Sequence, residues 1–285
     1  MSALGRKKRG VLAGTVLTVM IWAAPAPIAS AQQRAIPDFS SNQAGWVGVG
    51  GGFGVGGEVF SPVAGQLPPL HNDPAHPFVP NGARAQPNYR IADLSDPNLK
   101  PWVKERMKKD NDEVLAGKIA FTARSSCMPA GVPGFMAYGG PTPLYFVQTP
   151  KEVWLIFSGD QQVRRIYLDV PHSENPRPSW YGESVGHYEG DTLVIDTIGQ
   201  NDKTVVDPYR TPHTEKLHVV EQWKMVDGGK ALEVSFTVSD QDAFNAPWAG
   251  KRRYRRVEEP ITEDVCAENN LQFEYHIPVA NKLDF

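Results

Sequence analysis

The chain has 285 residues, of which 41% are hydrophobic, and 29 Lys and Arg stand against 32 Asp and Glu, a formal net charge of −3. This weakly acidic balance argues against nucleic acids and anionic membrane surfaces as partners. The length is sufficient for one substantial core, since all-β barrels of this size form single domains.

The first 31 residues have the three parts of a secretory signal peptide. Basic residues at positions 6–9 precede an apolar run from Val11 to Ala24, and Ala29-Ser30-Ala31 is a small-residue cleavage site. A membrane anchor is the alternative, but the apolar run is shorter than the ~20 residues that a bilayer span needs. We expect cleavage after Ala31, a periplasmic or extracellular location and no stable membrane anchor. The mature chain keeps 25 basic and 32 acidic residues, a net charge of −7.

Two cysteines, Cys127 and Cys266, remain in the mature chain. In an oxidising compartment an even pair favours a disulfide, and a catalytic thiol is the alternative. The bond would tie the segment before the predicted strands to the segment after them.

Composition divides the mature chain into four parts. Residues 32–92 are rich in Gly and Pro, which predicts an irregular arm with a flexible glycine linker anchored by Trp46 and Phe53. Its Gly52-x-Gly54-x-x-Gly57 pattern matches a dinucleotide fingerprint only formally, because neither a strand nor a helix flanks it, so we expect no cofactor. Residues 93–118 form a flanking helix, 119–275 a β domain and 276–285 a tail.

The predicted helix begins near Ser95 or Asp96, has Pro97 in its first turn and stops at Gly117. Spacings of three and four place apolar residues on one face. That face consists of Leu99, Trp102, Val103 and Met107.

From Pro143 onward the hydrophobic period is two, which predicts strands joined by tight turns. Eight short strands favour an all-β, mainly antiparallel meander closed into a lipocalin-like barrel, and a two-layer β-sandwich is the alternative. The expected strands are 144–148, 152–157, 163–168, 183–188, 191–198, 217–226, 231–238 and 248–257.

Residues 180–197 read Trp-Tyr-Gly-Glu-Ser-Val-Gly-His-Tyr-Glu-Gly-Asp-Thr-Leu-Val-Ile-Asp-Thr, and Asn201-Asp202-Lys203-Thr204 follows closely. With the segments that begin at Cys127 and Cys266, this motif resembles a large family of secreted bacterial proteins of unknown function. Tyr188 and Gln200 stand where the family has Trp and Phe. The resemblance covers about residues 90–275 and implies one domain with paired cysteines, but no activity.

The hairpin about Glu189-Gly190 allows its register to be predicted. A two-residue turn at these positions pairs Tyr188 with Asp191 and places Ser184, Gly186, Tyr188, Leu193, Ile195 and Thr197 on one face, the better interior. The opposite face carries Glu183 and Asp196, which are either an acid–base pair or solvated carboxylates.

Glu221 shares a strand face with Leu217, Val219, Trp223 and Met225. A carboxylate in such surroundings needs a partner, and we expect Arg252, Tyr254 or Arg256 of the last strand to supply it. The carboxylate serves either as a structural partner or as an acid with a raised pKa.

The loop between the central hairpin and this strand is dense in polar groups, which suits a site at a barrel mouth. His213 could act as a base oriented by Glu215. A zinc site is disfavoured because His218 points away from the apolar face of its strand and no H-E-x-x-H helix exists.

Two functions remain open. The first is binding of a small, largely apolar molecule inside the barrel, by Trp180, Tyr181, Ser184, Tyr188, Asn201, Trp223 and Tyr254. The second is cofactor-free acid–base catalysis as a lyase, isomerase or hydrolase, with His213, Glu215, Glu221, Asp202 and Asp207 at the barrel mouth. For the binding function, the competing interpretation is that these interior side chains fill a solid core and leave no room for a ligand. The sequence does not indicate an oligomeric state.

Overall fold

The computed structural model describes residues 36–40, 45–52, 56–78, 90–118, 120, 122–138, 143–159, 162–263 and 265–266. The chain divides into two compact units, Met1–Gln33 and Arg34–Phe285. All described residues belong to the second unit. The predicted signal peptide with its cleavage site, Phe53 and the predicted tail 276–285 lie outside the described residues.

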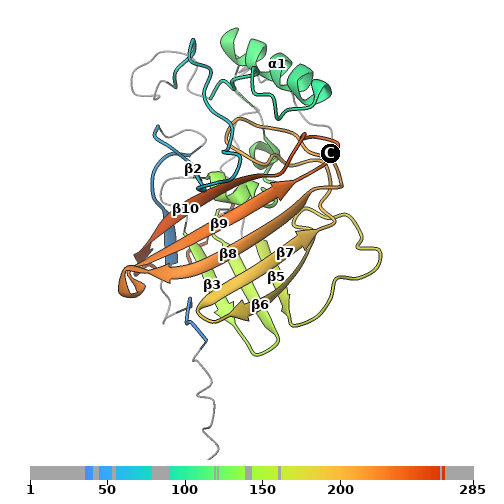
Figure 1. Cartoon of the computed structure of the whole chain (residues 1–285). Coiled ribbons are helices and arrows are strands. Elements are labelled where there is room, and N and C mark those ends of the chain that lie inside the picture. Colours follow the sequence, from blue (N-terminus) through green and yellow to red (C-terminus); the bar gives the residue numbers. More distant parts are fainter. Residues whose placement is uncertain are drawn as a thin grey trace, which may run out of the picture. The chain divides into compact units, whose positions relative to one another are not determined.

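Nine strands close into a barrel (Figure 1). They are β1 (Gly45–Gly48), β3 (Leu144–Gln148), β4 (Glu152–Phe157), β5 (Gln162–Leu168), β6 (Glu183–Glu189), β7 (Thr192–Ile198), β8 (His218–Val226), β9 (Ala231–Ser239) and β10 (Trp248–Val257). The short strand β2 (Ser61–Pro62) pairs with Gly250 and Lys251 of β10. The order β1-β3-β4-β5-β6-β7-β8-β9-β10 returns to β1, so the predicted all-β barrel is confirmed.

One neighbouring pair of strands departs from the predicted antiparallel meander. Strands β5 and β6 are parallel, with Ile166 opposite Ser184, whereas the other strand pairs of the barrel are antiparallel. Two parallel strands need a connection that carries the chain from the end of the first strand back to the end of the sheet at which that strand began. Residues 169–182 provide this connection between β5 and β6.

The glycine-rich segment that we expected to be a flexible linker contains the strand that closes the barrel. Trp46 lies opposite Leu144 of β3 and Arg256 of β10. Its ring is fully buried, and its Nε1 donates a hydrogen bond to the Phe39 carbonyl at 2.8 Å. The high glycine content hid this strand because glycine is depleted in strands.

The barrel interior is a packed apolar core. Along β5 and β9, for example, buried and more exposed residues alternate for most of the strand, as the two-residue period of a strand predicts. The rings of Phe146 and Tyr254 lie 5.5 and 5.6 Å from that of Trp223 between their centroids. Large side chains with no more than 1% exposure include Trp46, Trp223, Phe135, Leu144, Ile166 and Leu193.

The central hairpin has a register two residues away from the prediction. Tyr188 pairs with Leu193 instead of Asp191, because the turn lies at Gly190-Asp191. A shift of two preserves the side of the sheet on which each side chain lies. The predicted interior face is therefore correct although the predicted partners are wrong.

The helix α1 (Pro101–Leu115) begins about four residues later than predicted, with Pro101 rather than Pro97 in its first turn. Its buried face consists of Val103, Met107, Asp110, Asn111 and Val114. Trp102, which we placed on that face, is 40% exposed. Leu99 is buried but precedes the helix.

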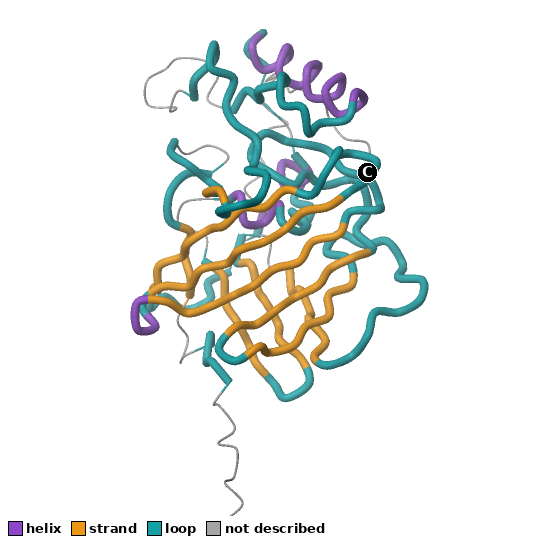
Figure 2. Tube along the Cα trace, in the orientation of Figure 1, coloured by secondary structure: helices purple, strands orange, loops and turns teal. Residues whose placement is uncertain are grey.

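Figure 2 shows α1 and most long loops at one end of the barrel. The short 3₁₀ helices η3 (Ala123–Ser126) and η4 (Gly134–Ala137) lie in the connection between α1 and β3. The Cys127–Cys266 disulfide is present, as predicted, and joins the end of η3 to the segment after β10.

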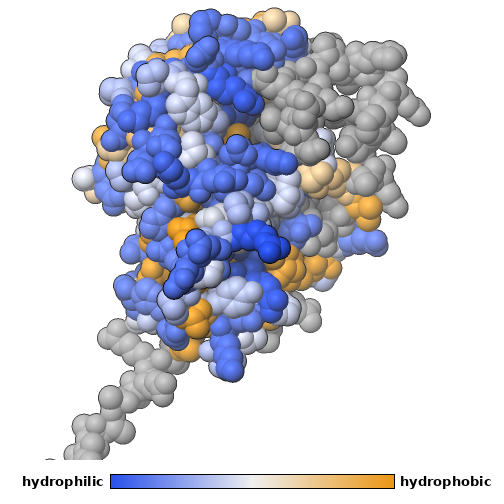
Figure 3. All heavy atoms as spheres, turned by 90° about the vertical axis from the view of Figure 1, so that its right-hand side faces the viewer, coloured by the Kyte–Doolittle hydropathy of each residue, from blue (hydrophilic) through white to orange (hydrophobic). Residues whose placement is uncertain are grey.

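The face of the molecule in Figure 3 is largely hydrophilic, with small separate hydrophobic areas. Separate exposed apolar side chains are ordinary for a protein surface. In the part of the chain that the structure describes, no helix is long and apolar enough to cross a membrane.

Candidate functional site: a cleft beside the arm

A cleft of about 700 Å³ lies between the N-terminal arm and the loop after β7. Its volume falls within the range of small-molecule sites, which are mostly apolar clefts with a few polar groups. The apolar wall is formed by Val59, Phe60, Pro62, Pro69, Leu70, Pro77, Phe78 and Pro208. The arm that we expected to be irregular therefore builds most of the cleft.

The arm is held in place by packing against the barrel. Phe60 is 6% exposed and makes an edge-to-face contact with Phe236 of β9, with ring centroids 4.9 Å apart. Strand β2 pairs with β10, where Lys251 lies opposite Ser61. The cleft is thus anchored to the barrel through Phe60 and β2.

Arg90 and Tyr209 lie side by side among the polar residues of the cleft, which also include Glu58, His71, Asn72 and Asp207. Arg90 is 3% exposed; its Nη2 donates to the Gly57 carbonyl at 2.6 Å, and its guanidinium lies 4.9 Å from the centre of the Phe78 ring. Burial raises the pKa of Tyr209 to about 12, although Arg90 opposes the shift. The Tyr209 hydroxyl is therefore protonated and neutral at physiological pH.

Asp207 is the one predicted catalytic residue that lines this cleft. Its Oδ2 accepts from the Thr211 hydroxyl at 2.6 Å, and its Oδ1 accepts from the backbone amides of Tyr209 and Thr211. These bonds shape the turn 207–211. Burial raises the pKa of Asp207, although its hydrogen bonds act in the opposite direction.

The other predicted catalytic residues do not converge with Asp207. His213 is 2% exposed; its Nε2 bonds the Thr204 hydroxyl at 2.8 Å and its Nδ1 bonds the Thr214 carbonyl at 2.9 Å. Burial lowers the pKa of His213. Because both ring nitrogens of His213 bond threonine oxygens, Glu215 does not orient the ring. Glu215 and Asp202 are exposed.

Glu221 is fully buried in the barrel, as its strand parity predicted, but its partner is Arg164. Both guanidinium Nη atoms bond the carboxylate, and Nη1 lies 3.1 Å from Oε1. The expectation that Arg252, Tyr254 or Arg256 supplies this partner is wrong. Arg164 shares the inward face of β5 with Ile166 and Leu168, so strand parity could have identified it.

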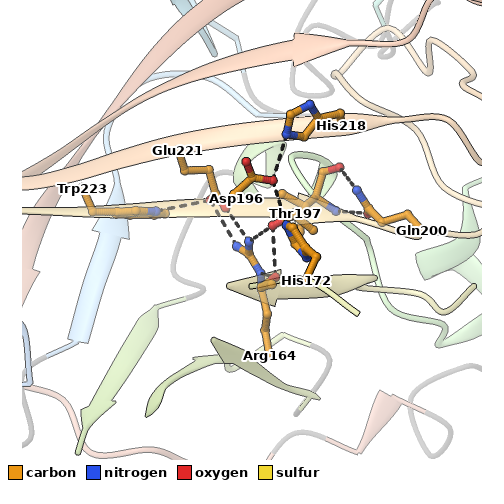
Figure 4. A network of polar contacts seen from close by, with 10 residues as sticks. Arg164, His172, Asp196, Thr197, Gln200, His218, Glu221 and Trp223 are labelled. Carbon is orange, nitrogen blue, oxygen red and sulfur yellow. Dashed lines mark hydrogen bonds and ion pairs between the residues drawn. The ribbon is translucent and has the colours of Figure 1, made fainter. Parts of the chain in front are cut away.

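Figure 4 shows that this ion pair belongs to a network of polar side chains inside the barrel. Arg164 also donates to Ser184 at 3.0 Å and to Thr197 at 2.7 Å, and Trp223 Nε1 donates to Glu221 at 3.2 Å. The network occupies interior space that a ligand in the barrel would need.

The predicted ligand-binding residues are distributed between this interior and the loops. Ser184, Trp223 and Tyr254 are buried and pack in the core. Tyr188 receives a 2.7 Å hydrogen bond from Gln148, and Tyr181 packs against Phe135 with ring centroids 6.4 Å apart. Trp180 and Asn201 are partly exposed loop residues outside the cleft.

A second polar network lies on the more exposed side of β6–β8 (Figure 4). His172 bridges Glu183 and Asp196, with nitrogen–oxygen distances of 3.1 and 3.0 Å, so these carboxylates share a neighbour although they are not opposite in the hairpin. His218 also bonds Asp196, at 2.8 Å, which raises the pKa of His218. His172 follows β5 in a loop without periodicity, and its sequence carries no signal for this role.

No group of three or more His, Cys, Asp or Glu among the described residues has the geometry of a metal site. In the network above, the imidazoles are hydrogen-bonded directly to carboxylates. Searches of known protein families, curated proteins and solved structures find no match to this chain. The fold and the cleft are therefore the observations on which a function can be argued.

Proposed function

We propose that the protein binds a small, largely apolar molecule, and that the cleft beside the arm is the binding site. The observation that carries this proposal is the cleft of about 700 Å³ with its apolar wall. In this proposal the ligand binds outside the barrel, because the interior positions expected to hold it carry packed rings and the Arg164–Glu221 network.

Export to the periplasm or the medium belongs to the same proposal, and so does membership in the secreted bacterial family that the sequence resembles. The Cys127–Cys266 disulfide supports export, because such bonds persist in oxidising compartments. The enzyme alternative has no specific support, since the contacts of His213, Glu221 and Asp207 are separate from one another.

Fluorescence titration with neutral 1-anilinonaphthalene tests the proposal, because this apolar dye becomes bright when it leaves water. We expect saturable binding at one site per chain. Leu70→Gln should weaken binding about tenfold or more, because a buried leucine contributes roughly 1.5–3 kcal/mol and 1.4 kcal/mol is a factor of ten.

Leu67→Gln is the matched control, since Leu67 is 44% exposed, belongs to the same arm and does not line the cleft. It should leave the dissociation constant unchanged. Absence of saturable binding, or equal effects of the two variants, would refute the proposed site.

A further inference from the structure

Two buried arginines bind the backbone of the same glycine-rich segment. Arg90 donates through Nε to the Gly52 carbonyl at 3.2 Å, and Arg252 of β10 donates through Nη2 to the Gly51 carbonyl at 3.0 Å. Arg90 lines the cleft, whereas Arg252 lies on the inward face of β10. The segment 48–52 therefore connects the cleft to a second cation in the barrel.

The glycines of this segment make room for the guanidinium groups. A Cβ atom on Gly51 would lie 2.7 Å from Nη2 of Arg90, and one on Gly48 would lie 2.5 Å from Nη2 of Arg252. Both distances are below those that real Cβ atoms show. Gly48 and Gly51, which precede the Gly52-x-Gly54-x-x-Gly57 pattern, therefore leave space for two cations.

Arg252 is bound only by neutral groups among the described residues. It is 2% exposed and donates to the carbonyls of Val59, Gly51 and Tyr138, while its Nε makes no hydrogen bond. Burial lowers the pKa of Arg252, and the positive charge of Arg90 lowers it further. Arginine nonetheless remains protonated in proteins, so the glycine-rich segment 48–52 contacts two like charges, one in the cleft and one in the barrel.

The two carboxylates that line the cleft in the described part of the chain are held by other groups. Asp207 has its oxygens committed to Thr211 and to backbone amides, and its burial disfavours the charged form. Glu58 is exposed, and its Oε2 accepts from Ser61. Water screens the charge of an exposed carboxylate more effectively than that of a buried guanidinium.

We infer that the ligand of the cleft is an amphipathic anion, whose apolar body lies against Phe60, Leu70 and Phe78 and whose single acidic group lies beside Arg90. The inference rests on the proposed function and specifies the ligand class of that site. An anion there gains a charge-assisted interaction with Arg90 and relieves the repulsion between Arg90 and Arg252. A neutral molecule of equal size gains neither.

A pair of dyes that differ by one charged group tests the inference on the wild-type protein. Neutral 1-anilinonaphthalene and 8-anilino-1-naphthalenesulfonate share the same rings, and only the second carries a sulfonate. We expect the sulfonate to bind about tenfold more tightly and to compete with the neutral dye for one site, because charge-assisted hydrogen bonds are about twice as strong as neutral ones.

Arg90→Gln should abolish this preference, and circular dichroism should verify that the variant is folded. Arg177→Gln is the matched control, since it removes the same charge from an exposed loop residue outside the cleft, and it should keep the tenfold ratio. If Arg90→Gln does not fold, the ratio measured on the wild-type protein decides alone.

Equal affinities of the two dyes for one shared site would overturn the anion inference and leave the proposed function intact. An equal loss of the preference in Arg177→Gln would assign it to surface charge and also overturn the inference. Failure of the neutral dye to bind at all would instead refute the proposed function.

Discussion

The Arg164–Glu221 pair allows a quantitative test of how the barrel tolerates charge in its interior. The two side chains are 1% and 0% exposed. Removal of one partner of such a pair leaves an uncompensated buried charge, which costs about 3–5 kcal/mol. Glu221→Leu is therefore expected to lower the free energy of unfolding by about that amount, a large part of the ~5–15 kcal/mol typical of a domain.

The double variant Arg164→Met/Glu221→Leu separates the charge from the packing. It removes both charges, and such replacements are often neutral or stabilising by about 1–4 kcal/mol. Here the Trp223 Nε1 group loses its acceptor, which costs about 1–3 kcal/mol, while Ser184 and Thr197 still bond one another at 3.0 Å. We expect the double variant to be at least ~2 kcal/mol more stable than Glu221→Leu.

Urea denaturation followed by tryptophan fluorescence and by circular dichroism measures all three proteins. Coincident transitions with both probes show that a two-state free energy applies. If Glu221→Leu costs less than ~1 kcal/mol, or if the double variant is no more stable than Glu221→Leu, the reasoning about this buried pair is wrong.

Three further results are expected. Reduction of the Cys127–Cys266 disulfide, which closes a separation of 139 residues, should lower the unfolding midpoint and cost up to about 4–5 kcal/mol, and intact mass with and without reductant verifies the bond; two free thiols in the native protein would contradict it. Gly48→Ala should destabilise the protein by about 1–3 kcal/mol in urea, because the new methyl group would overlap a buried guanidinium, and unchanged stability would mean that the guanidinium has room to move. The pKa of His218 is raised by Asp196, so this residue contributes stability that is complete below pH 6.5 and is lost as the pH rises through its folded pKa; the loss should be modest because the pair is partly exposed. Asp196→Asn should flatten the dependence of the thermal unfolding midpoint on pH between pH 6 and 9. An unchanged slope in this variant would contradict the assignment.

The parts of the fold that the sequence predicted well are those governed by a two-residue period. The strands 144–148, 152–157 and 248–257 agree with β3, β4 and β10 at both ends. The inward face of β8 was also correct, because parity alone determines which side chains share a face. Parity does not determine partners, and the hairpin register was therefore wrong by two residues.

The candidate site could not be derived in the same way. Cleft residues such as Phe60, Leu70 and Arg90 lie in an arm without periodicity, and their positions depend on contacts with β10 and with the loop at Asp207. Such long-range contacts leave no pattern in a single sequence. The density of polar residues after β7 drew attention to His213 and Glu215, whereas the structure assigns His213 to hydrogen bonds within its own loop.

The two residues at which the chain differs from the motif that it resembles, Tyr188 and Gln200, both have specific contacts. Gln200 binds the backbone of Val132 through two hydrogen bonds, of 2.7 and 2.8 Å, and the Tyr188 hydroxyl binds Gln148. Neither a Trp nor a Phe side chain supplies these groups in the same form. The sequence marked both positions as unusual but did not indicate their partners.

The closing position of β1 has a consequence for the order of folding. This strand is made early in synthesis, yet one of its two neighbours is β10. Gly48 of β1 lies opposite Tyr254 of β10, about 200 residues later in the sequence. Folding slows as contacts become more distant along the chain. A nascent chain can therefore form hairpins such as β6–β7 and β8–β9 early, and β1 can pair with β3, but the edge of β1 that pairs with β10 and the last edge of the growing sheet stay open until β10 has been made. During that interval the unpaired edges are accessible to other chains, so assembly of this barrel should depend on keeping partly made molecules apart.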